Sequence, residues 1–571
     1  MEYSGARILI ESLIAEGVDT VFGYPGGAVL FIYDELYKQQ DRIRHILVSH
    51  EQHAAHAADA YARTTGKVGV CIATSGPGAT NLVTGIATAY MDSVPLVAIT
   101  GNVATNLLGK DSFQEVDIAG VTMPVVKHNW IVKNIGELGE IIREAFIVAR
   151  SGRPGPVLID IPKDITNQTA VWTANSEENA DATLSQRAKR LSVRNSRATW
   201  TDSDINKACA MLAEAKKPVI YAGGGVIISD AASKVQKLAE KIDSPVTSSL
   251  MALGALPYNH RLWTGMIGMH GTVASNKAVQ NCDLLITIGA RFSDRVTSRP
   301  DSFASGAKVL QFDIDPAEVN KNIATDFCVV GDIKKTLQHL LENFTEKLPK
   351  PAWQKEIAAW KEVIPQELQK DKTLRPRFII EKTAEKLGVD TIVATDVGQH
   401  QIWTAQYYPW TKARSFITSG GLGTMGYGLG AAIGAKIACP DKPVVLFTGD
   451  GSFRMNCGEL ATAAAYNVPI IIVILNNTVL GMVRQWQNLF HGGRFSATVL
   501  DRPPDFVKLA QAYSLRGYRA ADEASFLKVL DKAVADNTEG ITAVIEALID
   551  KDEVVLPMVP GGKPIDEQIL Q

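Results

Sequence analysis

Short, continuous apolar runs recur through most of the 571-residue chain, and a segment with a helical pattern follows each of them. Examples are SVPLVAIT, GPVLIDIP, CDLLITIGA and PVVLFTGDG. Strands that are apolar at every position are typical of parallel sheets covered by helices on both faces. The alternation of strand and helix predicts βαβ units, so we expect an α/β fold made of doubly wound parallel sheets.

Breaks in this pattern divide the chain into domains. Polar residues dominate 167–200, and a charged, helix-like passage precedes residue 375. We therefore predict a first domain over 1–166, a linker over 167–200 and a central domain over 201–345. A second linker over 346–375 leads to a third domain over 376–550. Residues 551–571 hold many turn formers, so we expect a tail there that is a candidate lid.

Composition argues against several classes of function. Lys and Arg total 58 against 61 Asp and Glu, which gives no basic surface for nucleic acid or an anionic membrane. We find no run of about 18 apolar residues and no signal-peptide pattern at the start of the chain. The six cysteines are scattered without CxxC pairs and form no disulfide framework. A reducing, cytoplasmic location is therefore expected.

An aspartate and an asparagine follow two consecutive predicted strands. Asp450 follows VVLFTG, and Asn477 ends PIIIVILNN, with a predicted helix over 457–466 between them. The two strands should be parallel, which places both side chains at the sheet edge where ligands bind in open α/β folds. A carboxylate with an amide carbonyl suits Mg²⁺, and the flanking Gly449 and Gly451 would let a phosphate approach the backbone. Alternatively, Asp450 caps a helix and Asn477 makes an ordinary turn.

The GDG and NN pair resembles the diphosphate–metal motif of thiamine-diphosphate enzymes. Such an enzyme needs a shielded carboxyl group that hydrogen-bonds the aminopyrimidine and so favours the tautomer able to take the thiazolium proton. Glu51 opens a predicted helix in HILVSHEQHAAHAADAYART, among small and apolar neighbours. It could instead be a helix N-terminal glutamate favoured by the dipole. A metal site with His50, His53 and His56 is disfavoured because the spacing is HExH and not HExxH.

The order of motifs extends the resemblance over the whole chain. The stretches similar to thiamine-diphosphate decarboxylases and synthases are VSHEQHAAHAADAYAR, TSGPGATN, SGRPGPVLIDIPKD, SGGLGTMGYG, GDGSF and NN. More narrowly, FGYPGGAVL, GMHGT, DVGQHQIW and LGMVRQWQ resemble the catalytic large subunits of acetohydroxyacid (acetolactate) synthases. The resemblance implies a pyrimidine-binding first domain, an FAD-type central domain and a third domain that binds diphosphate and Mg²⁺.

The resemblance also implies the residues around thiamine diphosphate. Asp450, Asn477 and the backbone carbonyl of Val479 would ligate Mg²⁺, and Met425 would hold the cofactor in a bent shape. The positions that match cofactor-binding residues of the family are Glu51, Gly398, Gln399, His400, Gly423, Met425, Asp450, Gly451, Ser452 and Met482.

The central domain resembles one that carries FAD as a structural group with no net redox step. The matching positions are Arg153, Gly223, Gly224, Gly225, Leu250, Gly268, Met269, His270, Gly271, Gly289, Ala290, Arg291, Ser293, Asp313, Ile314 and Asp332. YAGGG alone is weak support, because a glycine cluster after a strand is often only a turn. The family usually reads RFDDR where this chain reads RFSDR, and Ser293 keeps a hydroxyl that can hydrogen-bond.

A further group of positions matches family residues near the substrate. Gln114 and Lys127, with Glu51, are predicted to be catalytic, and the predicted substrate residues are Gly27, Phe113, Arg295 and Trp486. Trp486 resembles the residue that favours 2-oxobutyrate over pyruvate as acceptor, a discrimination by one methylene worth about 1–3 kcal/mol. Arg295 would pair bidentately with the carboxylate of the second 2-oxo acid. Alternatively, Trp486 is a packed core aromatic and Arg295 makes a surface salt bridge.

The reaction that the resemblance implies is that of an acetohydroxyacid synthase. Pyruvate loses CO₂, and the hydroxyethyl carbanion joins pyruvate or 2-oxobutyrate to give 2-acetolactate or 2-aceto-2-hydroxybutyrate, on the way to valine, leucine and isoleucine. In the family each active site lies between the first domain of one subunit and the third domain of another. A homodimer or homotetramer is therefore expected, and a small regulatory subunit is a further expected partner.

Several other functions fit these motifs less well. Pyruvate oxidase, a 2-oxo acid decarboxylase and the flavin-free catabolic acetolactate synthase would use the same cofactor, but Trp486 and GMHGT argue against them. Glyoxylate carboligase lacks the glutamate that Glu51 supplies. Intact Glu51, Asp450 and Asn477 disfavour a regulatory nucleotide-binding protein with a dead site. A nicotinamide dehydrogenase would need a GxGxxG turn with a later acidic residue.

Overall fold

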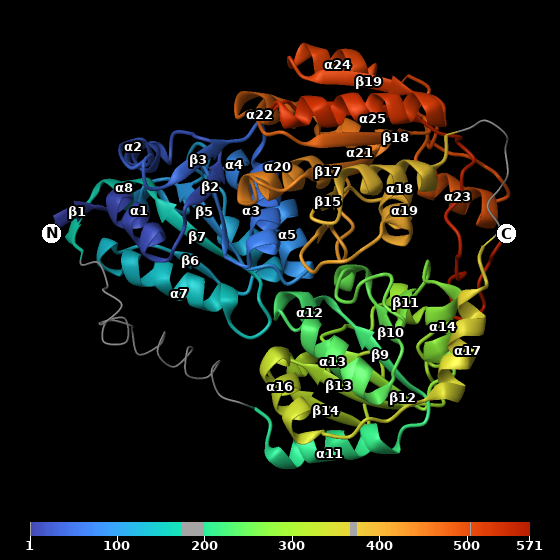
Figure 1. Cartoon of the computed structure of the whole chain (residues 1–571). Coiled ribbons are helices and arrows are strands. Elements are labelled where there is room, and N and C mark those ends of the chain that lie inside the picture. Colours follow the sequence, from blue (N-terminus) through green and yellow to red (C-terminus); the bar gives the residue numbers. More distant parts are fainter. Residues whose placement is uncertain (1, 173–198, 366–373, 503) are drawn as a thin grey trace.

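Three six-stranded sheets form the framework of the molecule (Figure 1). The computed structural model describes residues 2–172, 199–365, 374–502 and 504–571. Each sheet is flanked by helices, and every pair of neighbouring strands within the three sheets is parallel. The predicted fold class, three doubly wound parallel-sheet domains, is therefore confirmed.

In each sheet the strand order departs from the chain order, as crossover helices require. The first sheet runs β3 (Arg44–Leu47), β2 (Thr20–Gly23), β4 (Gly69–Ala73), β5 (Leu96–Asn102), β7 (Pro156–Pro162), β6 (Asn129–Ile131). The central sheet runs β11 (Trp263–Met266), β10 (Val246–Ser248), β9 (Pro218–Ala222), β12 (Leu284–Ile288), β13 (Lys308–Asp313), β14 (Phe327–Val330). The third runs β16 (Phe416–Ile417), β15 (Ile392–Thr395), β17 (Val444–Gly449), β18 (Ile471–Asn476), β20 (Ala543–Leu548), β19 (Arg516–Ala520).

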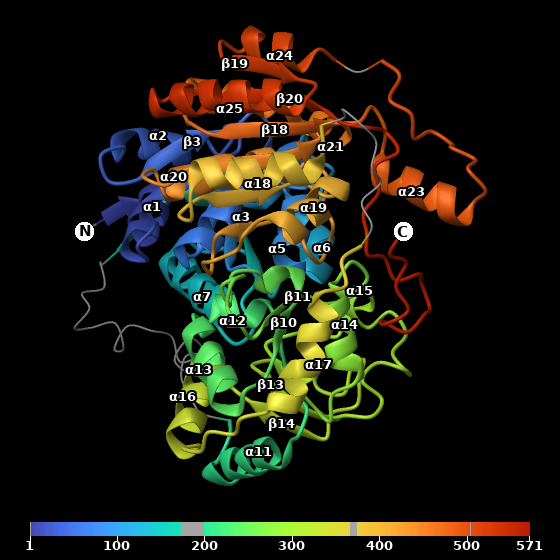
Figure 2. The same cartoon turned by 45° about the vertical axis from the view of Figure 1, so that its right-hand side comes forward.

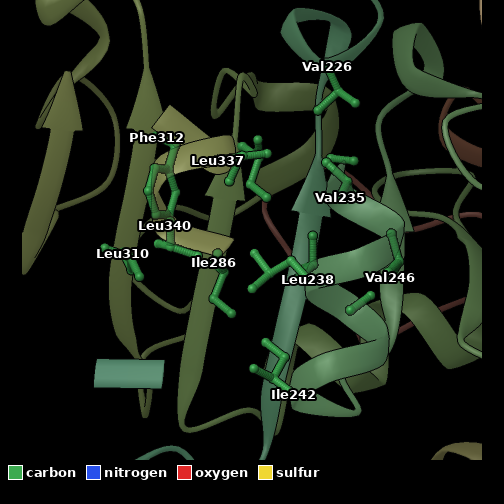
Figure 3. Packing of buried hydrophobic residues seen from close by; sticks show 14 of the residues in the cluster. Val226, Val235, Leu238, Ile242, Val246, Ile286, Leu310, Phe312, Leu337 and Leu340 are labelled. Carbon is green, nitrogen blue, oxygen red and sulfur yellow. The ribbon is translucent and has the colours of Figure 1, made fainter. Parts of the chain in front are cut away.

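The core of the central domain shows how helices cover these sheets (Figure 3). Helix α13 (Ala232–Ile242) points Val235, Leu238 and Ile242 at one face of the strands. Their spacing of three and four residues places them on one side of the helix. Helix α16 (Ile333–Asn343) adds Leu337 and Leu340 to the same cluster. Strand β12 is buried at every position because both faces of the sheet meet helices.

The first and third domains meet through two helices, α3 (Glu51–Thr65) and α20 (Gly428–Ala438), which lie side by side in Figure 1. Alanines occupy much of α3, so its backbone can approach a neighbouring helix closely. A Cβ atom on Gly434 would lie only 2.1 Å from the carbonyl oxygen of Ala57. The contact therefore depends on glycine at this position of α20.

The C-terminal tail, 551–571, contains no helix, as its turn formers predict. It runs between the third and central domains, where its backbone accepts hydrogen bonds from Gln399 at Glu553 and from Asn276 at Ile565. In turn, the amide of Val559 donates to the carbonyl of Met269. Figure 2 shows the tail beside α23 (Gly481–Phe490), the helix that projects from the third domain. Whether the tail acts as a lid stays a prediction.

The two predicted linkers differ in how much of each the structure describes. Most of the first linker, 173–198, lies outside the described residues. The second contains helix α17 (Pro351–Lys361), whose Trp353 is buried against the central domain and donates from Nε1 to the carbonyl of Pro218. A short antiparallel pair, β1 (Glu2–Ser4) with β8 (Thr169–Val171), lies apart from the three sheets. No helix in the described part of the chain is long and apolar enough to cross a membrane.

Candidate active site

Asp450 and Asn477 lie at the carboxyl ends of two adjacent strands of the third sheet. Strands β17 and β18 are paired in parallel, with Gly449 opposite Leu475. Asp450 begins helix α21 (Asp450–Asn456), and Asn477 follows β18. The predicted βαβ arrangement of the aspartate and the asparagine is therefore present at one edge of the sheet.

The carboxylate of Asp450 is buried and incompletely paired. Its Oδ2 has no hydrogen-bond partner among the described residues, and burial raises the pKa of Asp450 to about 6. A buried ionised carboxylate is costly unless a cation or donors compensate it. Asn477 faces the same region and accepts the amide of Val479 at Oδ1, at 3.2 Å. This set of oxygen ligands fits a bound Mg²⁺.

Gln399 and His400, at the start of helix α19 (Gln399–Tyr407), lie beside the two turns that carry Asp450 and Asn477. These two turns are together called the metal loop. Asn477 Nδ2 donates to Gln399 Oε1 at 3.3 Å. The ring of His400 lies 3.0 Å from where a Cβ on Gly449 would be, so a larger residue at 449 would collide with it. Burial lowers the pKa of His400 to about 3, so the imidazole is neutral, and its Nε2 is buried with no described partner.

Other residues predicted to bind the cofactor lie around the same edge. Gly398 has a φ of 147°, which places it in the region that favours glycine. Ser452 Oγ donates to the carbonyl of Val397 at 3.2 Å. Gly423 and Met425 lie on the loop that follows β16, and Met482 lies in the first turn of α23. A Cβ on Gly451 would meet Leu480, so that turn is closely packed.

Glu51 is placed on the first domain, at the N-terminus of α3. Its side chain is buried, and Oε2 accepts a hydrogen bond from Asn81 Nδ2 at 2.9 Å. Gly78 faces Oε1, which lies 3.2 Å from the position of a Cβ atom there. No hydrogen bond in the described part of the chain links Glu51 to the metal loop. The single chain therefore holds Glu51 and the residues predicted to bind Mg²⁺ on separate domains.

The histidines near Glu51 do not form a metal site. His53 and His56 are buried in the contact between α3 and α20, and burial lowers the pKa of His53 to about 3. Among the described residues, no three His, Cys, Asp or Glu side chains are grouped so that they could hold a metal ion. The alternative of a metal centre at His50, His53 and His56 therefore has no geometric support.

Residues predicted to contact substrate from the first domain lie on its loops. Phe113 is 89% exposed, and Gln114 has a φ of 58° and packs against Gly76. Gly27 has open space where a Cβ would stand. Lys127 is engaged elsewhere, since its ammonium donates to the carbonyls of Val148 and Ser151 at 2.5 Å. These carbonyls lie at the C-terminal end of helix α7 (Leu138–Arg150).

The two hydrogen bonds from Lys127 therefore stabilise the fold of the first domain, whatever the catalytic role of this residue. Burial, and the positive charge of Arg153, lower the pKa of Lys127 to about 8. A cation at a helix C-terminus is favourable because the last carbonyls are unpaired there.

Arg295 and Trp486, from different domains, are in contact. Arg295 lies on the short helix α15 (Asp294–Thr297) of the central domain, and Trp486 lies on α23. The guanidinium carbon is 5.8 Å from the centroid of the indole ring, within cation–π distance. The indole Nε1 is buried without a described hydrogen-bond partner, whereas the Arg295 side chain is 63% exposed. A guanidinium and an apolar ring thus lie next to each other where the central and third domains meet; this pair is called the Arg295–Trp486 wall.

The residues predicted to bind FAD gather at the carboxyl edge of the central sheet. Gly223 follows β9, Gly289 follows β12 and Asp313 ends β13, and these three strands are adjacent. A Cβ on Gly223 would lie 2.2 Å from the carbonyl oxygen of Gly289, so these glycines let two turns pack together. Burial and the neighbouring Glu318 raise the pKa of Asp313 to about 6.

The remaining positions predicted for FAD lie around this edge. Arg153 reaches it from the first domain and pairs with Glu318 at 3.0 Å. Met269, in the Gly268–Gly271 turn, donates its amide to the carbonyl of Arg295. Residues on or beside the same turns are Gly224, Gly225, Leu250, His270, Ala290, Arg291, Ser293 and Ile314, whereas Asp332 caps α16 by accepting the amide of Lys335. A nearby guanidinium, a buried carboxylate and close glycine turns are a set of groups that suits a dinucleotide.

Three thiamine pyrophosphate enzyme family models match the chain. They are the N-terminal TPP binding domain over residues 3–121, the central domain over 205–340 and the C-terminal TPP binding domain over 396–547. Glu51 falls within the first match, and Asp450 and Asn477 fall within the third.

Relatives match over nearly the whole length of the chain. A probable acetolactate synthase large subunit of Methanocaldococcus jannaschii is 46% identical over 98% of this chain and 94% of its own. The acetolactate synthase isozyme 3 large subunit of Escherichia coli is 43% identical over 99% of this chain and 98% of its own. The chain belongs to the acetolactate synthase large subunit family. The acetolactate synthase large subunit of Parasynechococcus marenigrum is 45% identical over 98% of this chain and 90% of its own.

Membership of the acetolactate synthase large subunit family explains why the polar groups are divided. Both the first and the third family models are TPP-binding domains, so one cofactor draws on two kinds of domain. Asp450 and Asn477 lie within the match to the C-terminal model, and Glu51 lies within the match to the N-terminal model. Asp450 is the first residue of α21 and Gly449 is its N-cap, so the side chain of Asp450 does not occupy the N-cap position of the alternative interpretation.

Two further residues lie among the predicted site residues of this member of the acetolactate synthase family. Asn81 binds Glu51, and its place in the TSGPGATN motif could have indicated it. Gln485 is buried in α23 and joins Gln399 to the amide of Val555 in the tail. It lies between polar and aromatic residues in RQWQ, so no period or motif distinguished it. The bond from Val555 to Gln485 forms only because the C-terminal tail packs against α23, which the sequence does not predict.

Proposed function

We propose that this chain catalyses the acetolactate synthase reaction. Two molecules of pyruvate give 2-acetolactate and CO₂, and pyruvate with 2-oxobutyrate gives 2-aceto-2-hydroxybutyrate and CO₂. The observation that carries the proposal is the wall made by Arg295 and Trp486, which offers both a cation for a carboxylate and an apolar face for a short alkyl group. A carboxylate and a short alkyl group are what pyruvate and 2-oxobutyrate have in common.

Thiamine diphosphate, when bound, supplies the electron sink that allows a 2-oxo acid to lose CO₂. Asp450, Asn477 and the backbone carbonyl of Val479 would hold the Mg²⁺ that the diphosphate requires. Gly398, Gln399, His400, Gly423 and Met425 surround the rest of the cofactor.

Glu51 holds or moves a proton at the pyrimidine ring, because its buried carboxyl group has only Asn81 as a described side-chain partner. The domains around the site would exclude water, which formation of a carbon–carbon bond between two 2-oxo acids requires. Arg295 orients the carboxylate of the acceptor, and Trp486 favours an ethyl over a methyl group by about 1–3 kcal/mol.

FAD is proposed for the central domain as a structural group. Asp313 would accept hydrogen bonds from hydroxyl groups, and Arg153 and Arg291 would face the anionic part of the dinucleotide. The glycine turns at Gly223 and Gly289 let backbone amides approach it.

We propose an assembly of at least two chains, which the placement of Glu51 and Asp450 on separate domains supports. In a homodimer the first domain of each subunit would complete the metal loop of the other, and a homotetramer would repeat this pair. The relatives are named large subunits, so we propose a small regulatory subunit as a further partner. The domain bounds given above and a cytoplasmic location belong to the same proposal.

The test uses purified full-length protein with thiamine diphosphate, Mg²⁺ and FAD. Pyruvate is supplied with and without 2-oxobutyrate, and the products are identified by mass spectrometry. We expect acetolactate from pyruvate alone and its replacement by acetohydroxybutyrate when 2-oxobutyrate is added. Acetaldehyde would indicate a 2-oxo acid decarboxylase, and acetyl phosphate would indicate a pyruvate oxidase; either product overturns the proposed reaction.

A further inference from the structure

The loop that carries Gly423 and Met425 belongs to the third domain, but the first domain of the same chain holds it. Asp92 of the first domain accepts the amide of Gly420 at 2.9 Å and the amide of Gly421 at 2.7 Å. Further along the loop, the hydroxyls of Thr88 and Thr424 lie 2.7 Å apart. Thr88 of helix α5 (Val83–Met91) and Asp92, the C-cap of that helix, therefore fix the loop on either side of Gly423.

A buried ionic network orients Asp92. The guanidinium of Arg63 is 2.9 Å from Asp92 and 2.6 Å from Asp59. Asp59 also accepts the hydroxyl of Tyr427, the residue at the end of the loop, at 2.5 Å. The side chains of both aspartates are fully buried, and that of Arg63 is 9% exposed. Such charges are costly to bury, so each depends on its partners.

The loop between these fixed points is open. Residues 420–423 are exposed, and Gly423 has a φ of 73°, which favours glycine. Its own domain holds the ends of the loop, where Gln401 Nε2 donates to the carbonyl of Ser419 at 3.2 Å and Asn456 Nδ2 donates to that of Gly426 at 3.0 Å. Within the loop, the amide of Thr424 donates to Ser419 Oγ at 3.0 Å. The charged bonds from Asp92 are stronger than a neutral bond of this kind.

We propose that Asp92 is a positioning residue, held in place by Arg63, that fixes the loop of residues 419–427 where thiamine diphosphate binds. The inference rests on the proposed cofactor, and Asp92 acts through Gly420 and Gly421 without touching the reacting atoms. Arg63 and Asp59 lie on α3, the helix that Glu51 begins. One helix thus carries the acid–base group of one site and anchors the cofactor loop of its own chain.

The test compares Asp92→Asn with the wild-type full-length protein. Asparagine keeps the shape but removes the charge and one acceptor oxygen. We expect amide hydrogen exchange of residues 418–427 to become at least about tenfold faster without cofactor. We also expect the Kd for thiamine diphosphate, measured by calorimetry with Mg²⁺ present, to rise by about tenfold or more. At saturating cofactor, kcat should fall less than kcat/KM for thiamine diphosphate.

A matched control is available in the central domain. Asp283 also accepts two consecutive amides, those of Lys216 at 2.7 Å and Lys217 at 2.8 Å, far along the chain from the loop. Asp283→Asn should leave both the exchange of 418–427 and the Kd for thiamine diphosphate unchanged. If Asp92→Asn does not fold, Thr88→Val removes the second fixed point with an isosteric side chain and should change both measurements in the same direction.

Two results would overturn the inference. One is unchanged exchange of 418–427 in Asp92→Asn and Thr88→Val. The other is faster exchange with an unchanged Kd, which would make Asp92 a support of the loop with no bearing on the cofactor. Failure of the wild-type protein to bind thiamine diphosphate is a different result, because it overturns the proposed function and the inference together.

Discussion

Arg295 of the central domain lies over the indole ring of Trp486 in the third domain, with 5.8 Å between the guanidinium carbon and the ring centroid. Neither side chain alone would mark a substrate site, because exposed arginines and half-buried tryptophans are common. Their contact joins a cation to an apolar face at the place where α23 meets the central domain. The choice between acceptors should therefore depend on this pair.

The first prediction concerns Trp486→Leu. Loss of the indole face should lower the preference for 2-oxobutyrate over pyruvate by about 10–200-fold, the range for one methylene. Competition between the two acceptors, followed by mass spectrometry of the products, measures the ratio. Phe490→Leu is the control, since Phe490 packs edge-to-face on Trp486 at 6.0 Å but is itself exposed. An unchanged product ratio in Trp486→Leu would return this residue to the role of a packed aromatic.

The second prediction concerns Glu51→Gln. The amide keeps the bond to Asn81 and the shape of the site but cannot exchange a proton, so kcat should fall by about 10²–10⁴-fold. The Kd for thiamine diphosphate should change little, and calorimetry checks it. Glu342→Gln on the exposed surface of α16 serves as the control. Normal turnover in Glu51→Gln would sink the acid–base role.

The third prediction concerns Asp450→Ala. Removal of the buried carboxylate should abolish Mg²⁺-dependent retention of thiamine diphosphate, because Mg²⁺ has few other protein ligands here. Gel filtration of the loaded protein, followed by cofactor analysis, measures retention. Asp505→Ala removes a helix-capping aspartate of the same domain and should leave retention intact. Equal retention in the two variants would contradict the metal-ligand role.

The fourth prediction follows from the raised pKa of Asp450, about 6 instead of the ordinary 3.8. The ionised carboxyl is disfavoured by burial, so its contribution to folding stability is fullest below the ordinary pKa and is lost as pH rises through about 6. Mg²⁺ works in the opposite direction, because it binds the ionised form. Its affinity should be constant above pH 6 and fall toward about tenfold per pH unit below it. Calorimetric Mg²⁺ titrations across this range check the slope, which Asp450→Asn should remove.

The fifth prediction concerns the crossing of α3 and α20. In Gly434→Ala the new Cβ would lie 2.1 Å from the carbonyl of Ala57, so the helices must separate. We expect a loss of about 1–3 kcal/mol of unfolding free energy. Gly458→Ala is the matched control, since nothing lies within 4 Å of its Cβ position. Chemical denaturation of both variants decides the matter, and equal midpoints would show that the crossing is loosely packed.

The sequence predicted best what depends on local pattern. Helix α3 (Glu51–Thr65) begins at Glu51, where the sequence predicts the start of a helix. The parallel pairing of β17 with β18 follows from two apolar runs and the helix between them. Strand β19 (Arg516–Ala520) was not foreseen, because the sequence RGYRA carries no apolar run.

What the sequence could not supply are bonds between distant segments. Asp92 and Gly420 are 328 positions apart, and no spacing rule connects an aspartate at a helix end with two loop amides. Lys127 shows the converse case. Its family match suggests the substrate, yet the ammonium is bonded to carbonyls at the end of α7. Side-chain direction is set by packing, which residue type alone does not encode.

The placement of Glu51 and Asp450 on different domains, with no hydrogen bond between them in the described chain, has a genetic consequence. In the proposed dimer, a Glu51→Gln subunit paired with an Asp450→Ala subunit would assemble one site carrying both defects and one carrying neither. Two alleles that are each inactive alone would therefore complement one another, restoring up to half of the sites in every mixed pair.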